Sequence, residues 1–128
     1  MLEKSTIIIP TVDNCEYLIF CINSIKKNSF FNHEIIVHLN GLDHESEAFL
    51  KDSKIHYTKS NINIGLCSGV NLASKQATTN FIIYAHDDMY FLPKWDEYLA
   101  KEVSIHKHNK FYLSMTQISH TIGEKDNI

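Results

Sequence analysis

The chain has 128 residues, of which 44% are hydrophobic, 11% aromatic and 21% charged, and its formal net charge is -3. This length and composition predict a single folded domain over residues 1–128 and exclude a wholly disordered chain. The slightly negative net charge gives the chain no overall attraction for nucleic acid. No apolar run approaches the roughly 20 residues of a membrane-spanning helix. We therefore expect no nucleic-acid partner and no transmembrane segment.

Predicted strands and helices alternate along the chain. Residues 6–9 form a β-branched run that ends at Pro10, which predicts a buried parallel strand, and a helix that Asp13 or Asn14 can cap begins near Cys15. Further strands are expected at residues 34–39, 54–57, 80–85 and 111–117, and further helices at residues 44–51 and 69–77 and from Pro93 onward. This alternation predicts an α/β fold with a mostly parallel sheet and flanking helices, and the polar residues 119–128 predict a flexible tail.

The cysteines indicate a reducing compartment. Cys15, Cys21 and Cys67 are odd in number and include no CxxC pair, so they predict neither a disulfide framework nor a zinc site. Small buried thiols are the simplest interpretation. Because the start of the sequence also lacks the pattern of a signal peptide, we expect a cytoplasmic protein.

Polar residues follow three of the predicted strands, at the point where each strand ends. Thr11 comes just after the first strand and Asn40 after the second, while Asp87 and Asp88 come after the strand at residues 80–85. The carboxyl ends of parallel strands meet at one edge of a sheet, and open α/β sheets bind their ligands at that edge. We therefore expect these polar segments to converge on one site.

Asp87 and Asp88 are the sharpest chemical feature of the sequence. Two adjacent carboxylates after an apolar strand repel each other unless a cation, water or hydrogen-bond donors compensate their charge. Their oxygens suit Mg²⁺ or Mn²⁺, which bridge carboxylates and phosphates, and the chain has no arginine that could hold a phosphate instead. The alternative is a solvated turn in which one of the two aspartates caps the following segment.

Four segments, taken in order, resemble the successive signatures of family 2 glycosyltransferases with the GT-A fold. They are residues 5–14 (STIIIPTVDN), 34–41 (EIIVHLNG), 61–71 (NINIGLCSGVN) and 81–95 (FIIYAHDDMYFLPKW), and the resemblance extends over residues 5–103. It implies a GT-A-like domain of the nucleotide-diphospho-sugar transferase type, which is Rossmann-like, with a truncated sheet.

The resemblance places the nucleotide at the ends of the first two strands. Pro10 and Thr11 would flank the base, and Glu16 would be the acid that the family often carries after this turn, or else an ordinary acid in the first turn of a helix. Asn40 stands where the family usually carries a uracil-binding Asp, and its side-chain oxygen can accept from the imide N–H without charge. Lys59 could approach the diphosphate or could be a solvated loop lysine.

The resemblance also implies a metal site. His86, Asp87 and Asp88 match the DXD-type motif of the family, with His86 in place of the first acid. Asp88 would ligate Mn²⁺ or Mg²⁺ directly, and Asp87 would face the ribose or take part in holding the metal and its water shell. Residues 63–65 and Asn71 match a loop and a helix start beneath the sugar-nucleotide, and the glycine of that loop could supply a positive-φ turn.

The reaction implied is the inverting transfer of a sugar from a nucleoside-diphosphate sugar, a UDP-sugar in the first instance, to a hydroxyl of a saccharide or another acceptor. Complete family members are longer and carry the catalytic carboxylate in their later half, so no catalytic residue is assigned here. Two alternatives stay open: a sugar-nucleotide-binding domain or subunit without its own catalytic base, and an unrelated doubly wound domain whose acidic pair holds a structural Mg²⁺. A homodimer could cover the free edge of a truncated sheet.

Overall fold

The computed structural model describes residues 4–107 and 110–115. A four-stranded sheet in the order β3-β2-β1-β4 forms its centre, and all three strand pairs are parallel. The predicted tail at residues 119–128 and the last two residues of the strand predicted at 111–117 lie outside the described residues. The strands are β1 (Thr6–Thr11), β2 (Glu34–Asn40), β3 (His56–Ser60) and β4 (Ile82–Tyr84). The helices are α1 (Cys15–Asn28), α2 (His44–Asp52), α3 (Leu66–Ser74) and α4 (Trp95–Ser104).

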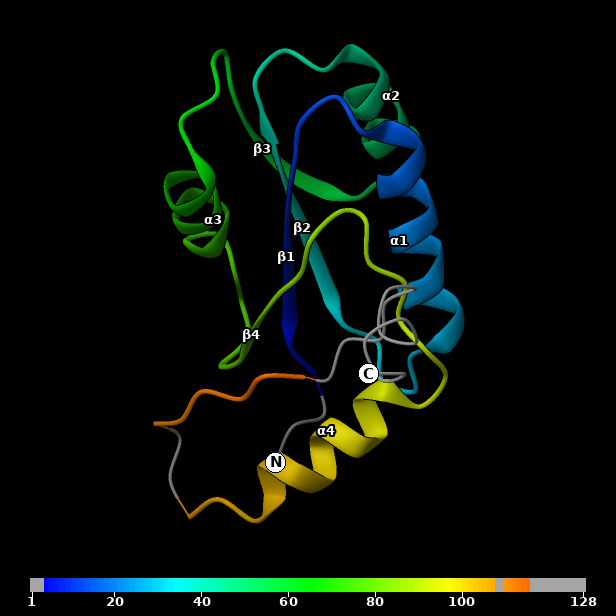
Figure 1. Cartoon of the computed structure of the whole chain (residues 1–128), viewed down its shortest axis with the longest axis vertical. Coiled ribbons are helices and arrows are strands. Elements are labelled where there is room, and N and C mark those ends of the chain that lie inside the picture. The colour runs from blue at the N-terminus through cyan, green and yellow to red at the C-terminus, as the bar shows by residue number, and fades with distance from the viewer. Residues whose placement is uncertain (1–3, 108–109, 116–128) are drawn as a thin grey trace, which may run out of the picture.

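Helices cover both faces of the sheet, with α1 and α2 on one side and α3 on the other (Figure 1). Successive residues of a strand point to opposite faces, so Ile7 and Ile9 join the core beneath α1 while Ile8 packs with Ala73 beneath α3. Every residue of β1 is buried. Because burial of one such side chain contributes about 1.5–3 kcal/mol, the isoleucine run favours an interior position for β1 in the sheet.

β1 continues through Pro10, although proline lacks an N–H and the prediction ended the strand there. The hydrogen bonds from Thr6 N–H to Phe81 O and from Ala85 N–H to Ile8 O show that residues 6 and 8 of β1 direct their backbone groups toward β4. The backbone of residue 10 also points toward β4, but the pairing of β1 with β4 ends at Ile8 and Tyr84. The missing N–H therefore removes no sheet hydrogen bond, which is why the strand tolerates Pro10.

The order of the elements from β1 to α4 is as predicted, but several of their bounds differ from the prediction. α3 begins at Leu66, three residues before the predicted helix, because Gly65 makes the turn with φ +87°. β3 is displaced toward the C-terminus because the chain first leaves α2 through Lys54, which has a left-handed φ of +55°. α4 begins at Trp95, after a left-handed Lys94, so Pro93 precedes the helix instead of occupying its first turn.

The predicted strand at residues 111–117 is wrong over its described part. Residues 111–115 are not in a strand, and β4 pairs only with β1 within the described sheet. Phe111 stacks instead on Phe81 and His106, with ring centroids 5.8 and 4.7 Å away. An apolar run that resembled a strand therefore provides aromatic contacts beside the start of β4.

A buried carboxylate fixes α4 beneath the amino end of the sheet. Asp96 accepts hydrogen bonds from the backbone N–H groups of Phe30 and Phe31, at 3.0 and 2.8 Å, and from His33 Nε2 at 3.0 Å. His33 in turn accepts at Nδ1 from the backbone N–H of Ser5, just before β1. Burial alone would raise the pKa of Asp96, but these three donors outweigh it and hold the pKa below its ordinary value.

Candidate functional site

The exits of β1 and β4 meet through one hydrogen bond. Thr11 Oγ1 donates to Asp87 Oδ2 at 2.7 Å across a separation of 76 residues in the chain. Thr11 is buried and Asp87 is partly buried, so this bond lies at the rim of the sheet rather than in open solvent. The convergence of the first and last polar segments, predicted from the positions of the strand ends, is confirmed.

The two adjacent carboxylates lie above α1. Cys21 Sγ donates to the backbone oxygen of His86 at 3.6 Å. Burial, followed by the negative charges of Asp87 and Asp88, raises the pKa of this thiol to about 12. Asp88 is exposed, unlike the partly buried Asp87. One carboxylate is thus oriented by Thr11, while its neighbour faces solvent, where a ligand can reach it.

Tyr84 connects the exit of β4 electrostatically with the first turn of α3. Burial raises the pKa of Tyr84, and the charges of Cys67 and Asp87 raise it further, so the phenol lies within electrostatic reach of both. Cys67 belongs to the first turn of α3, and Tyr84 is the last residue of β4. The Tyr84 ring also contacts the ring of His86, with centroids 4.9 Å apart. The edge of the sheet is therefore bordered by β1, by β4 and by the start of α3.

Asn40 lies at the end of β2 with both ends of its amide in use. Its Oδ1 accepts from Ile64 N–H at 2.8 Å, and its Nδ2 donates to Gly65 O at 3.1 Å. Asn63 Oδ1 accepts from Gly65 N–H at 2.9 Å within the same loop. These contacts bring residues 63–65 to the end of β2, and no pattern in the sequence indicated them.

Asp43 makes a structural link near the ends of β1 and β2 that the sequence reasoning did not assign. Its carboxylate caps α2 by accepting from Ser46 N–H at 3.1 Å, and it also accepts from Asp13 N–H at 3.2 Å. It therefore links the turn after β1 to the start of α2. An Asp immediately before the predicted helix at 44–51 was the signal for the cap, whereas nothing in the sequence indicated the contact with Asp13.

The comparison with protein families decides the affiliation. The model of "Glycosyl transferase family 2" matches residues 6–126. The chain belongs to glycosyl transferase family 2. A comparison with curated proteins gives no match. Solved structures show the fold, which is that of GT-A glycosyltransferases.

Three structures of S. aureus TarS illustrate this similarity. TarS 1-349 has 23% sequence identity to this chain and a TM-score of 0.70 over 80% of this chain and 33% of its own. Its complexes with UDP and with UDP-GlcNAc each have 21% identity, with TM-scores of 0.71 and 0.72, and each match covers 80% of this chain and 32% of the other. This family 2 chain thus spans about a third of the length of these structures.

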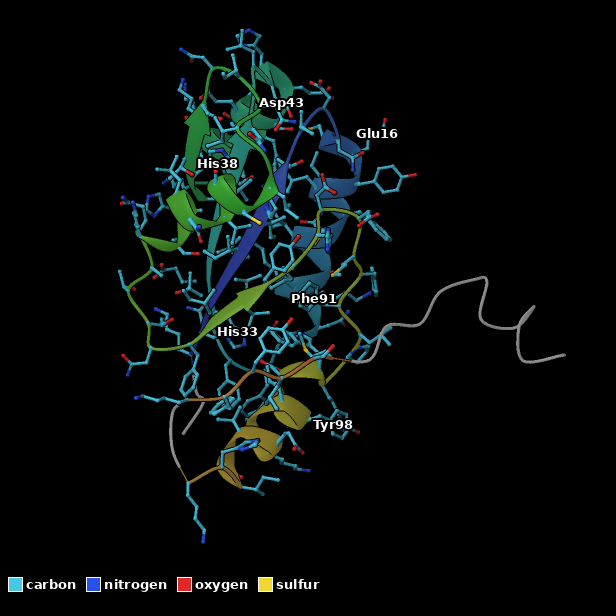
Figure 2. The ribbon with its side chains drawn as sticks, turned by 60° about the vertical axis from the view of Figure 1, so that its left-hand side comes forward. Glu16, His33, His38, Asp43, Phe91 and Tyr98 are labelled. Carbon is cyan, nitrogen blue, oxygen red and sulfur yellow. The ribbon has the colours of Figure 1, made fainter. Side chains whose placement is uncertain are left out.

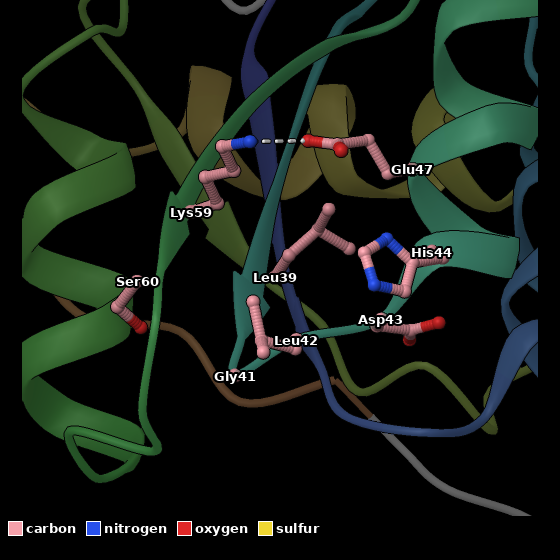
Figure 3. Close-up of a pocket in the computed structure, with 8 residues that line it drawn as sticks. All are labelled: Leu39, Gly41, Leu42, Asp43, His44, Glu47, Lys59 and Ser60. Atoms are coloured by element: carbon pink, nitrogen blue, oxygen red, sulfur yellow. Dashed lines mark ion pairs between the residues drawn. The ribbon is translucent and has the colours of Figure 1, made fainter.

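Two other residues that the family resemblance singled out do not touch the acidic pair in this structure. Glu16 is exposed in the first turn of α1, and Figure 2 shows it at the same end of the molecule as Asp43. Lys59 Nζ pairs instead with Glu47 Oε2 at 3.0 Å, on the α2 side of the sheet (Figure 3). A nucleotide role for Glu16 stays a prediction, and this lysine is already engaged by α2.

A small pocket lies beside that ion pair, with a volume of about 40 Å³. It is lined by Leu39, Gly41, Leu42, Asp43, His44, Glu47, Lys59 and Ser60 (Figure 3). Such a volume holds roughly two or three water molecules, so the pocket alone does not accommodate a nucleoside. The exits of β1 and β4, rather than this pocket, remain the candidate ligand site.

The oxygen donors of this family 2 chain determine which metal it could hold. No group of three or more His, Cys, Asp or Glu residues within 4–107 and 110–115 could hold a metal ion. Asp87 and Asp88 offer two hard oxygen donors, and Mg²⁺ ordinarily combines one or two carboxylates with phosphate oxygens and water. The donor set therefore fits a cation that binds together with a diphosphate. Nor does any helix among the described residues have the length and apolar character that a membrane crossing requires.

Proposed function

We propose that this chain binds a nucleoside-diphosphate sugar, with UDP as the nucleotide, at the carboxyl ends of β1 and β4. The observation that carries this proposal is the hydrogen bond from Thr11 to Asp87, which joins the first-strand exit to the acidic pair in a chain of family 2. The TarS structures determined with UDP and UDP-GlcNAc support the choice of a UDP-sugar as donor.

In this proposal the base lies against Pro10 and Thr11, and the diphosphate lies near Asp87 and Asp88. Asp88 and Asp87 would hold Mn²⁺ or Mg²⁺, and the bound cation would supply neutralisation of the negative charge that develops on the departing diphosphate. Thr11 orients Asp87 through its hydroxyl, so the carboxylate is already fixed when the ligand arrives. Asp88 is exposed and free to turn toward the cation.

The proposed reaction is inverting transfer of the sugar to an acceptor hydroxyl, on a saccharide or another molecule. The base that would deprotonate that hydroxyl is not assigned. Since the chain spans about a third of the TarS structures, a second candidate is a domain that binds the sugar-nucleotide without catalysing transfer. The cytoplasmic location and the homodimer also stay predictions.

Isothermal titration tests the proposed binding. UDP should bind in the presence of Mn²⁺, and its affinity should fall at least tenfold when EDTA removes the metal, because the diphosphate then meets two uncompensated carboxylates. GDP and ADP serve as controls for the base. If UDP and UDP-GlcNAc produce no heat with Mn²⁺ present, the proposal is wrong.

Hydrolysis of UDP-GlcNAc, measured on the same samples, separates the two candidate functions. Release of UDP that requires Mn²⁺ supports the glycosyltransferase. Binding without release supports the non-catalytic binding domain.

A further inference from the structure

We propose that Asn40 is a positioning residue, whose amide holds the loop of residues 63–65 and with it the first turn of α3 at the nucleotide site. This inference rests on the proposed function. It assigns Asn40 a different task from direct reading of the base, which the family resemblance implied. Reading the base favours a strong acceptor at residue 40, whereas holding the loop also requires a donor. Experiment can therefore separate the two tasks.

The side-chain amide of Asn40 both accepts and donates a hydrogen bond. Its oxygen accepts from Ile64 N–H at 2.8 Å and its nitrogen donates to Gly65 O at 3.1 Å. The residue is only 6% exposed, so little of the side chain is open to a ligand. An ionised carboxylate can accept but cannot donate, and would therefore face the oxygen of Gly65 without a hydrogen.

A chain of polar contacts, partly buried, supports Asn40 from the side of β3. Ser60 Oγ donates to Ile62 O at 2.8 Å and lies 3.5 Å from Asn40 Oδ1. His38, which is fully buried, contacts Ser60 Oγ through Nε2 at 3.2 Å and Thr58 Oγ1 through Nδ1 at 2.7 Å. Because the single hydroxyl hydrogen of Ser60 serves the shorter bond to Ile62, the ring N–H at Nε2 donates to Ser60. Two neighbouring strands thus hold the same loop.

The position of α3 depends on this chain of contacts. Gly65, with φ +87°, turns directly into Leu66, so the position of the loop sets the position of the first turn. One turn further along, a Cβ on Gly69 would lie 2.7 Å from His38 Cδ2, and only glycine allows the helix to approach the ring so closely. α3 packs against the central part of the sheet, where its Ala73 shares a buried cluster with Ile8 of β1, the strand whose exit carries Thr11. Displacement of the loop would therefore move one border of the proposed site.

The substitution Asn40→Asp distinguishes the two tasks. If residue 40 reads the uracil imide, a carboxylate is a stronger acceptor and UDP should bind more tightly. If it positions the loop, UDP with Mn²⁺ should bind about 10- to 100-fold more weakly at pH 7.5, because a charged oxygen replaces the donor to Gly65. Burial and the adjacent carbonyl would raise the pKa of this Asp, and once protonated it can donate again. The loss, expressed relative to the parent at each pH, should therefore shrink toward pH 5.

Asn61→Asp is the matched control, because Asn61 is exposed in the same loop region and receives the same charge. We expect its UDP affinity to stay within about twofold of the parent at both pH values. An Asn40→Asp variant that binds UDP as tightly as the parent or more tightly at pH 7.5 overturns the inference. A loss that persists undiminished at pH 5 contradicts it as well.

Hydrogen exchange provides a second test that needs no nucleotide and does not depend on the behaviour of Asn40→Asp. In Asn40→Ala the backbone amide of Ile64 should exchange at least about tenfold faster than in the parent, because it loses its acceptor. Unchanged exchange at Ile64 overturns the inference. If the parent fails to bind UDP at all, the proposed function fails, while this exchange measurement still decides whether Asn40 holds the loop.

Discussion

Replacement of Asp88 by alanine should abolish the Mn²⁺-dependent part of UDP binding. Asp88 is the exposed member of the acidic pair, and its carboxylate would contact the cation directly in the proposed complex. Loss of one partner of such a charge contact costs about 2–5 kcal/mol, so the dissociation constant for UDP with Mn²⁺ should rise about 30-fold or more. Isothermal titration with Mn²⁺ and with EDTA measures this effect.

Asp52→Ala is the control for this result. Asp52 is exposed at the end of α2, and its substitution removes the same charge from the surface. Both variants should keep the parent's thermal midpoint, because exposed side chains outside special contacts change stability by only about 0.5 kcal/mol. If Asp88→Ala binds UDP with Mn²⁺ as tightly as Asp52→Ala, then Asp88 is not a metal ligand.

Replacement of Asp96 by alanine should lower the free energy of unfolding by about 3–5 kcal/mol, which is the usual cost of removing one partner from a buried charged network. The carboxylate satisfies two backbone N–H groups and His33, and its residue is fully buried. Alanine would leave all three donors without this acceptor. Urea unfolding measures the loss. Glu102→Ala, at an exposed position of the same helix, should change the free energy by less than about 0.5 kcal/mol.

The pH dependence of this effect follows from the sign of the pKa shift. The folded-state pKa of Asp96 is below its ordinary value, so the carboxylate stabilises the fold above the unfolded pKa, which is about 3.9. That contribution is lost as the pH falls through the folded pKa. The difference in unfolding free energy between the parent and Asp96→Asn should shrink as the pH falls below about 4. A difference that grows in acid would contradict this assignment.

The sequence predicted the layered arrangement because that arrangement depends on local patterns. The isoleucine run of β1 can only be a buried strand, and helical spacing in α1 places Leu18 and Cys21 against it. The meeting of Thr11 with Asp87 then follows from parallel topology alone. Family resemblance added the ligand class that we propose, which no pattern of hydrophobic residues contains.

The parts that were not predictable depend on contacts between distant residues. Asn40 is committed to Ile64 and Gly65, 24 and 25 residues away, and an Asn after a strand does not show which partner it will take. Residues 111–115 contain the apolar side chains of a strand, but Phe111 stacks on Phe81 and His106 instead of pairing at an edge. Side-chain packing, rather than β-propensity, decided that segment.

Paramagnetic broadening by Mn²⁺ in the presence of UDP tests most directly where the nucleotide and its cation bind. Spectra of the labelled protein are compared with Mg²⁺, which is diamagnetic, and with Mn²⁺. The signals of Thr11, Asp87 and Cys67 should disappear with Mn²⁺, while those of His33 and Asp96, which bond to each other beneath the opposite end of the sheet, should remain. Retention of the Thr11 and Asp87 signals when Mn²⁺ and UDP are bound would contradict the proposed site.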